Sequence, residues 1–440
     1  MRARSIVLSI SSLAASCALI GAAPPVPNAS FQTATSERLT NGTTIVAQAT
    51  GGGLIAAEIV LPAGLAQQTP ANAGVAGVTA ALVLRTQIDG GDSLADAAAK
   101  VGATVSYTLD PLDTRFYVEA QPAQFGRLLR GLAHAISAPD LGGFAAARAA
   151  ALSSSATAGA GPATAALDML RQVAYSGTGY AYPDGGRQIS LSKLTPADAS
   201  AFAALYHRSG PIVALEGEVD AAAINAVRTE FGGYTVRGRV AGGSSETTGS
   251  SSSRGHEVVT HRAVAAPWVA VGYPAPGIYT KDYPVMLVIE ALLGRGGDVH
   301  SFSLGSDNSL PGEFAGAYYQ YEAQPGMLAV FLNGSDASVD GAVRDLQGAV
   351  DRLRGPALSD AIVDHGRRLA VGQYYASIST LSDAAWLLGR AAASPDGPNF
   401  ENLVPIRIAH VSAADIRRVA RRYLTGEIVG IVLPQTSTQQ

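Results

Sequence analysis

The stretch Gly74-Val75-Ala76-Gly77-Val78-Thr79-Ala80-Ala81-Leu82-Val83-Leu84-Arg85-Thr86 decides how the fold of this chain is interpreted. It is almost entirely apolar over three helical turns, which is typical of a buried helix. An extended apolar run, Ile55 to Leu61, and a loop precede it. We therefore predict a strand, a loop and a buried helix, in this order, near the start of the folded part.

The composition indicates a globular protein with a large core. The chain has 440 residues, of which 47% are hydrophobic and 15% charged, and this length allows two or more domains. The formal net charge is −4, and the sequence contains no block of like charge. Because phosphate binding needs a basic surface, these values argue against nucleic acid as a partner.

The first residues have the pattern of a secretory signal peptide. Arg2 and Arg4 precede an apolar run from residue 6 to 21, and Gly21-Ala22-Ala23 supplies a small-residue cleavage site. The apolar run is short for a membrane span, and no other stretch approaches the required length. We expect residues 1–23 to be removed and the protein to be exported to the periplasm.

Cysteine usage adds a second possibility for localisation. Cys17 is the only cysteine, so the mature chain would contain no disulfide, no thiolate metal site and no cysteine nucleophile. Ala14-Ala15-Ser16-Cys17 is a loose version of a bacterial lipoprotein cleavage box. A lipid anchor through Cys17 is therefore the alternative to soluble export.

Strand and helix signals alternate along the first half. Asn41-Gly42 is a tight-turn dipeptide between two β-prone pieces, and Thr195-Pro196 combines a helix cap with a proline at the first helical position. Further elements are expected at 93–101 (helix), 104–108 and 114–120 (strands) and 121–137 (amphipathic helix).

The chain contains two copies of one unit. Residues 237–255 are rich in Gly and Ser and are expected to form a flexible tether. After it the pattern restarts: Leu194 to Tyr206 matches Val411 to Tyr423, and the helix at 74–86 corresponds to 282–294. The predicted organisation is a signal peptide (1–23), an N-terminal unit (36–236), the tether (237–255) and a C-terminal unit (256–435).

These features together resemble the pitrilysin/insulinase family of zinc peptidases. The resemblance rests on the order of short motifs over residues 36–435, namely Leu39-Thr40-Asn41-Gly42, Lys193-Leu194-Thr195-Pro196-Ala197-Asp198, Leu292-Leu293-Gly294-Arg295-Gly296-Gly297 and Gly316-Ala317-Tyr318. It implies an α+β fold of two tandem homologous α/β sandwich units. Each would be a mostly antiparallel sheet with packed helices, and the two would form half of a clamshell.

The resemblance also locates a zinc site that this sequence lacks. Active members carry H-x-x-E-H on the early helix, and the corresponding residues here are Gly77, Ala80 and Ala81. The third ligand would lie on the helix after Leu141, but residues 144–166 contain no acidic residue. Without these ligands no metal-bound water is available as a nucleophile. We therefore predict no catalytic residue and no metal in this chain, and expect zinc in a partner subunit.

The resemblance assigns candidate substrate-binding residues to the second unit. Tyr318 and Tyr319 could line a peptide groove, and Gly294, Gly296 and Gly297 could form a mobile loop beside it. Each set also has a plainer explanation. The tyrosines could pack as strand aromatics against Tyr321, and the glycines could end a helix.

Other possible metal ligands are weaker. The stretch His256-Glu257-Val258-Val259-Thr260-His261 has one residue more than the H-E-x-x-H motif. On a helix its two histidines would lie about 140° apart round the axis and could not share an ion. The stretch is also β-branched and flanks the tether. His300, Asp364 and His365 could bind metal in a symmetric dimer, although they are not at ligand spacing on one helix.

The sequence therefore predicts a catalytically inactive, pitrilysin/insulinase-like subunit. It would pair with a zinc-bearing homologue to form a chamber that degrades or processes peptides. The alternatives are a zinc metalloendopeptidase with ligands from an unrecognised site, and a structural core subunit of an envelope complex.

Overall fold

A computed structural model describes residues 34–158, 162–238, 256–294, 314–321, 325–333, 338–355 and 358–435. The first repeat contains the strands β1 (Thr35–Arg38), β2 (Thr44–Ala49), β3 (Ile55–Leu61), β4 (Thr104–Leu109), β5 (Thr114–Ala120) and β6 (Ile212–Gly217). Its helices are α1 (Val75–Arg85), α2 (Leu94–Lys100), α3 (Pro122–Ser137), α4 (Phe144–Ala158), α5 (Pro162–Ala174), α6 (Gln188–Leu191), α7 (Pro196–Tyr206) and α8 (Ala221–Gly232).

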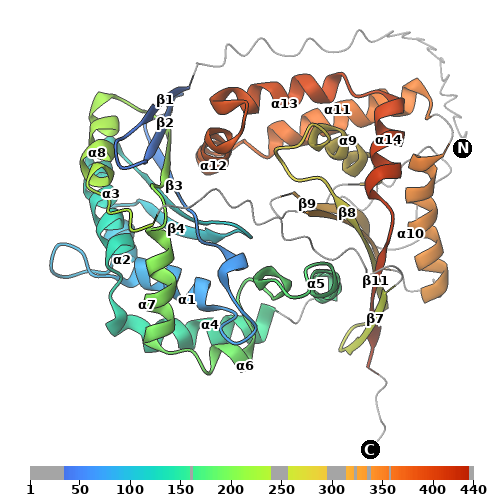
Figure 1. Ribbon diagram of the computed structural model, residues 1–440, viewed down its shortest axis with the longest axis horizontal. Helices are drawn as coiled ribbons and strands as arrows, with labels where there is room; N and C mark the ends of the chain where they lie inside the picture. Colours follow the sequence, from blue (N-terminus) through green and yellow to red (C-terminus); the bar gives the residue numbers. More distant parts are fainter. Residues whose placement is uncertain are drawn as a thin grey trace, which may run out of the picture. The chain divides into compact units, whose positions relative to one another are not determined.

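The second repeat follows the same order, without counterparts of β1, α2 and α8 among the described residues (Figure 1). Its strands are β7 (His256–Arg262), β8 (Trp268–Ala275), β9 (Phe314–Gln320), β10 (Gly326–Asn333) and β11 (Ile428–Pro434). Its helices are α9 (Tyr283–Leu293), α10 (Val339–Arg354), α11 (Asp360–Ala376), α12 (Leu381–Ala393), α13 (Phe400–Ala409) and α14 (Ala413–Tyr423).

The two sheets share one topology. The first has the order β1-β2-β6-β3-β5-β4 and the second β7-β11-β8-β10-β9. In each, one neighbouring pair is parallel (β2 with β6, β7 with β11), and the other pairs are antiparallel. The second sheet thus matches the first strand for strand, except that nothing in the described residues corresponds to β1. The predicted fold of two tandem α/β sandwich units, each with a mostly antiparallel sheet, is confirmed.

The same cap opens the equivalent helices α7 and α14. The Thr195 side chain accepts from the backbone N–H of Asp198, and the Asp198 carboxylate accepts from the Thr195 N–H at 2.8 Å. Ser412 and Asp415 form the same reciprocal pair at the start of α14. Such a capping box satisfies two otherwise unpaired helix N–H groups. The predicted correspondence of these segments therefore extends to individual hydrogen bonds.

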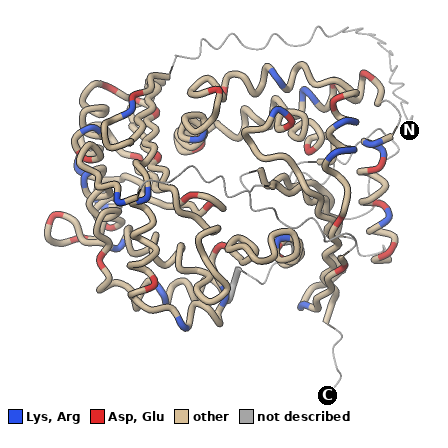
Figure 2. The backbone as a smooth tube through the Cα atoms, in the orientation of Figure 1, with Lys and Arg blue, Asp and Glu red and all other residues tan. Residues whose placement is uncertain are grey.

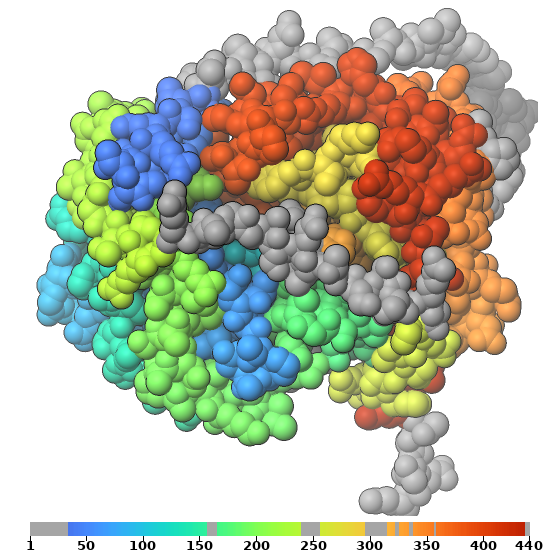
Figure 3. Space-filling view, in the orientation of Figure 1, coloured from blue at the N-terminus to red at the C-terminus, as the bar shows by residue number. Residues whose placement is uncertain are grey.

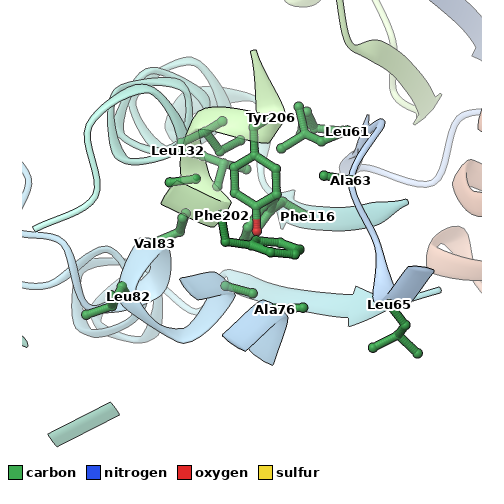
Figure 4. Packing of buried hydrophobic residues seen from close by; sticks show 14 of the residues in the cluster. Leu61, Ala63, Leu65, Ala76, Leu82, Val83, Phe116, Leu132, Phe202 and Tyr206 are labelled. Carbon is green, nitrogen blue, oxygen red and sulfur yellow. The ribbon is translucent and has the colours of Figure 1, made fainter. Parts of the chain in front are cut away.

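The core of the first repeat forms between its sheet and α1, α3 and α7. Ala76, Leu82 and Val83 of α1 lie in one cluster with Phe116 of β5 and the aromatic rings of α7 (Figure 4). Phe116 and Tyr206 meet edge to face with 6.0 Å between ring centroids. α1 is therefore the buried helix that its apolar sequence predicts.

Each repeat places one helix on the sheet of the other. α5 packs on β8 and β11, where a Cβ built on Gly272 would lie 3.2 Å from a methyl carbon of Leu170. α12 packs on β3 and β6, where a Cβ built on Gly389 would lie 3.2 Å from a methyl carbon of Val60. α5 and α12 occupy equivalent positions in their repeats, so the exchange is reciprocal. Figures 1 and 3 show the α12 region beside the first strands.

Several sequence predictions fall outside the described residues. These are the signal peptide at 1–23 and all but the first two residues of the tether at 237–255, so the predicted domain limits stay predictions. Among the described helices, none has the length and apolar character that crossing a membrane requires. In the view of Figure 2, acidic and basic residues are interspersed over the helices of both repeats.

Candidate functional site

The three residues at the motif positions lie on α1 and carry no ligand atoms. Ala80 is fully buried, and Gly77 and Ala81 are partly exposed. A Cβ built on Gly77 would meet Leu109 of β4 at 3.5 Å, an ordinary van der Waals contact. Hydrogen and methyl groups can neither coordinate a cation nor transfer a proton. This part of α1 therefore offers packing surface in place of zinc chemistry.

The start of α1 is held by neighbouring backbone and one buried glutamine. Gly74 precedes the helix at φ 99°, a conformation that glycine adopts without strain. The Gln68 side-chain oxygen accepts from the N–H groups of Gly74 (2.8 Å) and Ala76 (3.1 Å). These bonds satisfy donors that a helix N-terminus otherwise leaves unpaired. These contacts hold the start of α1 in place.

The helix expected to supply a third ligand is α4. Its polar side chains serve the structure: Arg148 donates to the Leu194 carbonyl at 3.0 Å, and Ser155 donates to the Gly186 carbonyl at 3.1 Å. Throughout the described residues, no group of three His, Cys, Asp or Glu side chains is arranged to hold a metal ion.

The loop before α6 packs tightly against the start of α1. Ser190 donates its hydroxyl to the Ala73 carbonyl at 2.7 Å. Gly186 has φ 78°, and a Cβ there would lie 2.6 Å from Gly74 Cα and 2.7 Å from Ala73 O. Any residue other than glycine would be strained at this φ, and its Cβ would clash with the backbone of residues 73 and 74.

We expect Gly186→Ala to lower the free energy of unfolding by about 2–3 kcal/mol, because it adds overpacking to an unfavourable φ. Urea denaturation followed by circular dichroism measures the change. Gly185→Ala is the matched control, since a Cβ on Gly185 meets no atom within 4 Å. Equal stability of the two variants would show that the loop does not press on α1 as described.

The side chains that the sequence analysis missed form a buried ionic cluster between the repeats. Arg115 of β5 binds Asp110 (2.6 Å) and Glu58 (2.8 Å), and Arg390 of α12 also binds Asp110. Asp113 lies 3.9 Å from each arginine. The sequence gives no signal for this cluster: the residues from 110 to 113 look like an ordinary charged turn, and Arg390 is far away along the chain.

The cluster contains three carboxyl groups and two guanidinium groups, so one carboxyl exceeds the available positive charge. Burial raises the pKa of Glu58 to about 8, although Arg115 opposes the shift. Burial also raises the pKa of Asp113 to about 7, against the attraction of Arg390. For Asp110 burial acts in the same direction, but Arg390 and Arg115 outweigh it and hold the pKa below its usual value. Asp110 is therefore the ionised partner of both arginines.

The two candidate tyrosines of the second repeat lie in different environments. Tyr318 is 44% exposed, whereas Tyr319 is 2% exposed and donates its hydroxyl to the Pro276 carbonyl. The Tyr319 ring packs on Tyr321 and Tyr283, at centroid distances of 5.5 and 6.0 Å. In this structure Tyr318 presents its ring at the surface, and Tyr319 belongs to the core. Contact of either with a peptide stays a prediction.

Of the three candidate glycines, the structure describes Gly294. It ends α9 at φ 87°, and its carbonyl accepts from the Ala317 N–H of β9. Gly296 and Gly297 lie outside the described residues, as does His300. Asp364, on α11, pairs with Arg367 at 3.2 Å. The end of α9 thus explains the glycine at position 294. A mobile loop of Gly294, Gly296 and Gly297 beside a peptide groove stays a prediction.

Comparison with known proteins supports the fold and gives no sequence-level relative. No family model matches the chain, and no curated protein matches it. Solved structures do. A protease from Helicobacter pylori has a TM-score of 0.81 at 16% identity, covering 92% of this chain and 100% of the other.

Two further similar structures are M16-type proteins. The inactive domain of a peptidase M16 from Pseudomonas fluorescens has a TM-score of 0.76 at 14% identity, covering 92% of this chain and 99% of the other. A protein described as an M16-like peptidase from Alicyclobacillus acidocaldarius has a TM-score of 0.73 at 15% identity, with coverages of 91% and 98%. The chain therefore has the fold of M16-type peptidase domains, consistent with its resemblance to the pitrilysin/insulinase family.

Proposed function

We propose that this protein is a catalytically inactive subunit that pairs with a zinc-bearing homologue to form a peptide-degrading or peptide-processing chamber. The main observation behind the proposal is the absence of metal-binding side chains at the motif positions of α1. The helix stands where the family resemblance places the zinc motif, but Gly77, Ala80 and Ala81 offer no ligand and no general base. The partner would supply zinc, the attacking water and the base.

The similarity to an inactive M16 domain supports this proposal, because it shows that the fold exists in a protein described as inactive. Preservation of the fold also fits a subunit that binds a partner subunit and a peptide. In the described residues, α1 packs on a hydrophobic core and the loop before α6 packs against its start. The buried ion pair of Arg390 with Asp110 links the two repeats. In the proposed pair, the two repeats form one half of a clamshell, and the surface around Tyr318 faces the peptide. Export to the periplasm belongs to the same proposal.

Metal content and peptidase activity test the proposal together. The purified mature chain is expected to bind less than about 0.1 zinc ion per chain, by elemental mass spectrometry, and to leave a quenched fluorescent peptide library uncut. Adding a zinc-bearing homologue from the same organism is expected to form a stable complex and to restore cleavage. A homologue with its own H-x-x-E-H glutamate replaced by glutamine is the control, and its complex should form without cleaving.

One result would contradict the proposal directly: stoichiometric zinc in the isolated chain, with cleavage that a chelator abolishes. That outcome would favour the zinc metalloendopeptidase alternative. Stable binding to other envelope proteins, with no zinc-bearing homologue among them, would favour the structural core alternative.

A further inference from the structure

The second sheet ends at β7, whose outer edge pairs with no strand in the described part of the chain. β7 is bound on its other side to β11 in parallel register, and the Arg262 carbonyl accepts from the Gln435 N–H on that side at 2.8 Å. Backbone groups of successive strand residues point to opposite sides. The N–H and C=O groups of Glu257, Val259 and His261 therefore point to the open edge.

The first sheet shows what the equivalent edge can hold. There β2 pairs with β6 in the same parallel manner, and β1 lies antiparallel along the outer edge of β2. The registers start at Ile212 with Thr44 and at Ile428 with His256. By this correspondence, the stretch of β2 that β1 covers matches residues 256–259 of β7. An additional strand thus has a structural precedent at this place in the same chain.

A cavity of about 640 Å³ lies beside this edge. α4, α5, the 183–188 loop and β7 line it, and Val258, Val259 and Thr260 are the lining residues at the middle of the strand. Val259 is 45% exposed. Open strand edges of this kind bind extended peptides through main-chain hydrogen bonds, and neighbouring side chains select the sequence.

The charges of the cavity favour an acidic occupant. Arg171 is neutralised by Asp184 at 2.7 Å and by Asp168 at 3.8 Å. Arg187 stacks on the Tyr182 ring at 4.8 Å and forms no salt bridge with another described residue. Arg262 is exposed and likewise has no carboxylate partner among the described residues. The lining therefore holds three arginines against two aspartates, with the charge of Arg187 also acting on Asp168, so one positive charge is in excess and can attract a carboxylate on a bound strand.

We propose that β7 binds an extended peptide segment of another protein, which adds antiparallel to its outer edge and places an acidic side chain beside Arg187. The proposal concerns the outer edge of β7 and does not depend on a zinc-bearing partner. The residues that precede β7 are mostly Gly and Ser, which are poor strand formers. The excess positive charge of the lining makes an acidic peptide the better fit.

Proline substitution separates edge binding from sheet integrity. The N–H of Val259 points outward, so Val259→Pro removes a donor to the added strand without breaking the ladder to β11. Val259→Thr is the matched control, because it keeps the N–H and the β-branched side chain. Arg187→Glu tests the charge contribution. Thermal melts followed by circular dichroism confirm that each variant is folded.

The probe is the fluorescein-labelled peptide Thr-Val-Glu-Val-Glu-Val-Thr-Val-Thr, measured by fluorescence anisotropy on the full mature chain. We expect binding that Val259→Pro and Arg187→Glu each weaken at least about tenfold and that Val259→Thr changes less than about twofold. The same peptide with lysine in place of glutamate should bind at least about tenfold more weakly. Hydrogen exchange of residues 256–262 should slow when the acidic peptide is added.

Four results would overturn the proposal. These are the absence of binding at about 1 mM peptide, equal binding by Val259→Pro, slow exchange of the Val259 amide already in the free protein, and a concentration-dependent dimer that Val259→Pro abolishes. The third result would mean that the chain covers its own edge, and the fourth that a second copy does. None of these results bears on zinc content, so the proposed function is judged separately.

Discussion

Arg390→Ala is expected to lower the free energy of unfolding by about 3–5 kcal/mol, because it leaves the buried carboxyl groups of the cluster with a single counter-charge. Arg390 is 6% exposed and reaches from α12 of the second repeat to Asp110 of the first. Its guanidinium also lies 5.4 Å from the Trp386 ring centroid. Removal would leave one guanidinium, that of Arg115, for three carboxyl groups. The substitution therefore acts on the contact between the repeats.

Trp386 fluorescence during urea denaturation reports this contact, since the ring packs on Arg390 and also lies 5.3 Å from Arg115. Arg407→Ala is the matched control. Arg407 pairs with Asp396 at 2.6 Å, but both side chains are substantially exposed, and such a pair contributes less than about 1 kcal/mol. Adding Asp113→Asn to Arg390→Ala should recover part of the loss, because it removes one unpaired acid. If the Arg390 variant were as stable as the Arg407 variant, the cluster would not hold the repeats together.

The reciprocal helix exchange explains why a contact of this kind matters. α12 covers the face of the first sheet that its own helices leave open, and α5 does the same for the second sheet. Val46, Ala214 and Leu388 form one small apolar cluster there, and Ala56, Tyr117 and Ala385 form another. Burying apolar area on both sheets favours association of the repeats. The ionic cluster lies within this apolar contact, where an unpaired charge is most costly.

Local patterns were sufficient to predict the elements and the repeat. The apolar stretch at 74–86 became α1, the cap at Thr195 opens α7, and the matching cap at Ser412 opens α14. These signals depend on residues within four positions of each other, which is why a single sequence reveals them. The β-branched stretch from 256 to 262 forms a strand.

Contacts between residues far apart in the chain could not be predicted from the sequence. Nothing local links Arg390 to Asp110, and a lone arginine on an amphipathic helix usually points to solvent. The burial of Tyr319 beside exposed Tyr318 depends on which face of β9 meets α9, and alternation alone does not assign that face. The open edge of β7 emerged only when the two sheets were compared. Sequence therefore predicted the elements and their repetition, whereas the structure showed how the repeats are joined.

The free energy of unfolding is expected to fall as pH rises from about 5 to about 9. The cause is a second pair of buried acids, Glu216 and Glu401, which has no cation beside it among the described residues. Glu216 of β6 accepts from the Thr50 hydroxyl at 3.4 Å. Burial raises its pKa to about 7. Burial, and then the charge of Glu216, raises the pKa of Glu401 on α13 to about 8. Neither carboxyl forms a salt bridge with any described residue. Both therefore favour the protonated form in the folded state.

The direction of this pH dependence follows from the number of protons bound by the folded and the unfolded state. Ordinary glutamates in the unfolded chain have a pKa near 4.5, whereas burial raises the pKa of Glu401 in the folded protein to about 8. Between these values the folded state binds more protons, so its stability is complete at lower pH and is lost as pH rises. Because Glu401 is only partly buried, we expect a loss of about 2 kcal/mol between pH 5 and pH 9. Urea denaturation at each pH measures it.

Glu401→Gln should reduce this loss by at least about half, since a neutral amide replaces the group that ionises. A residual loss of the same sign is expected from Glu216, Glu58 and Asp113, whose pKa values are raised to about 7, about 8 and about 7. Glu37→Gln is the matched control, because Glu37 is 42% exposed and pairs with Arg228 at the surface. It should leave the pH profile unchanged. A wild-type protein that is more stable at pH 9 than at pH 5 would show that these buried acids are ionised in the folded state, and the contact between the repeats would then have to supply a counter-charge other than Arg115 and Arg390.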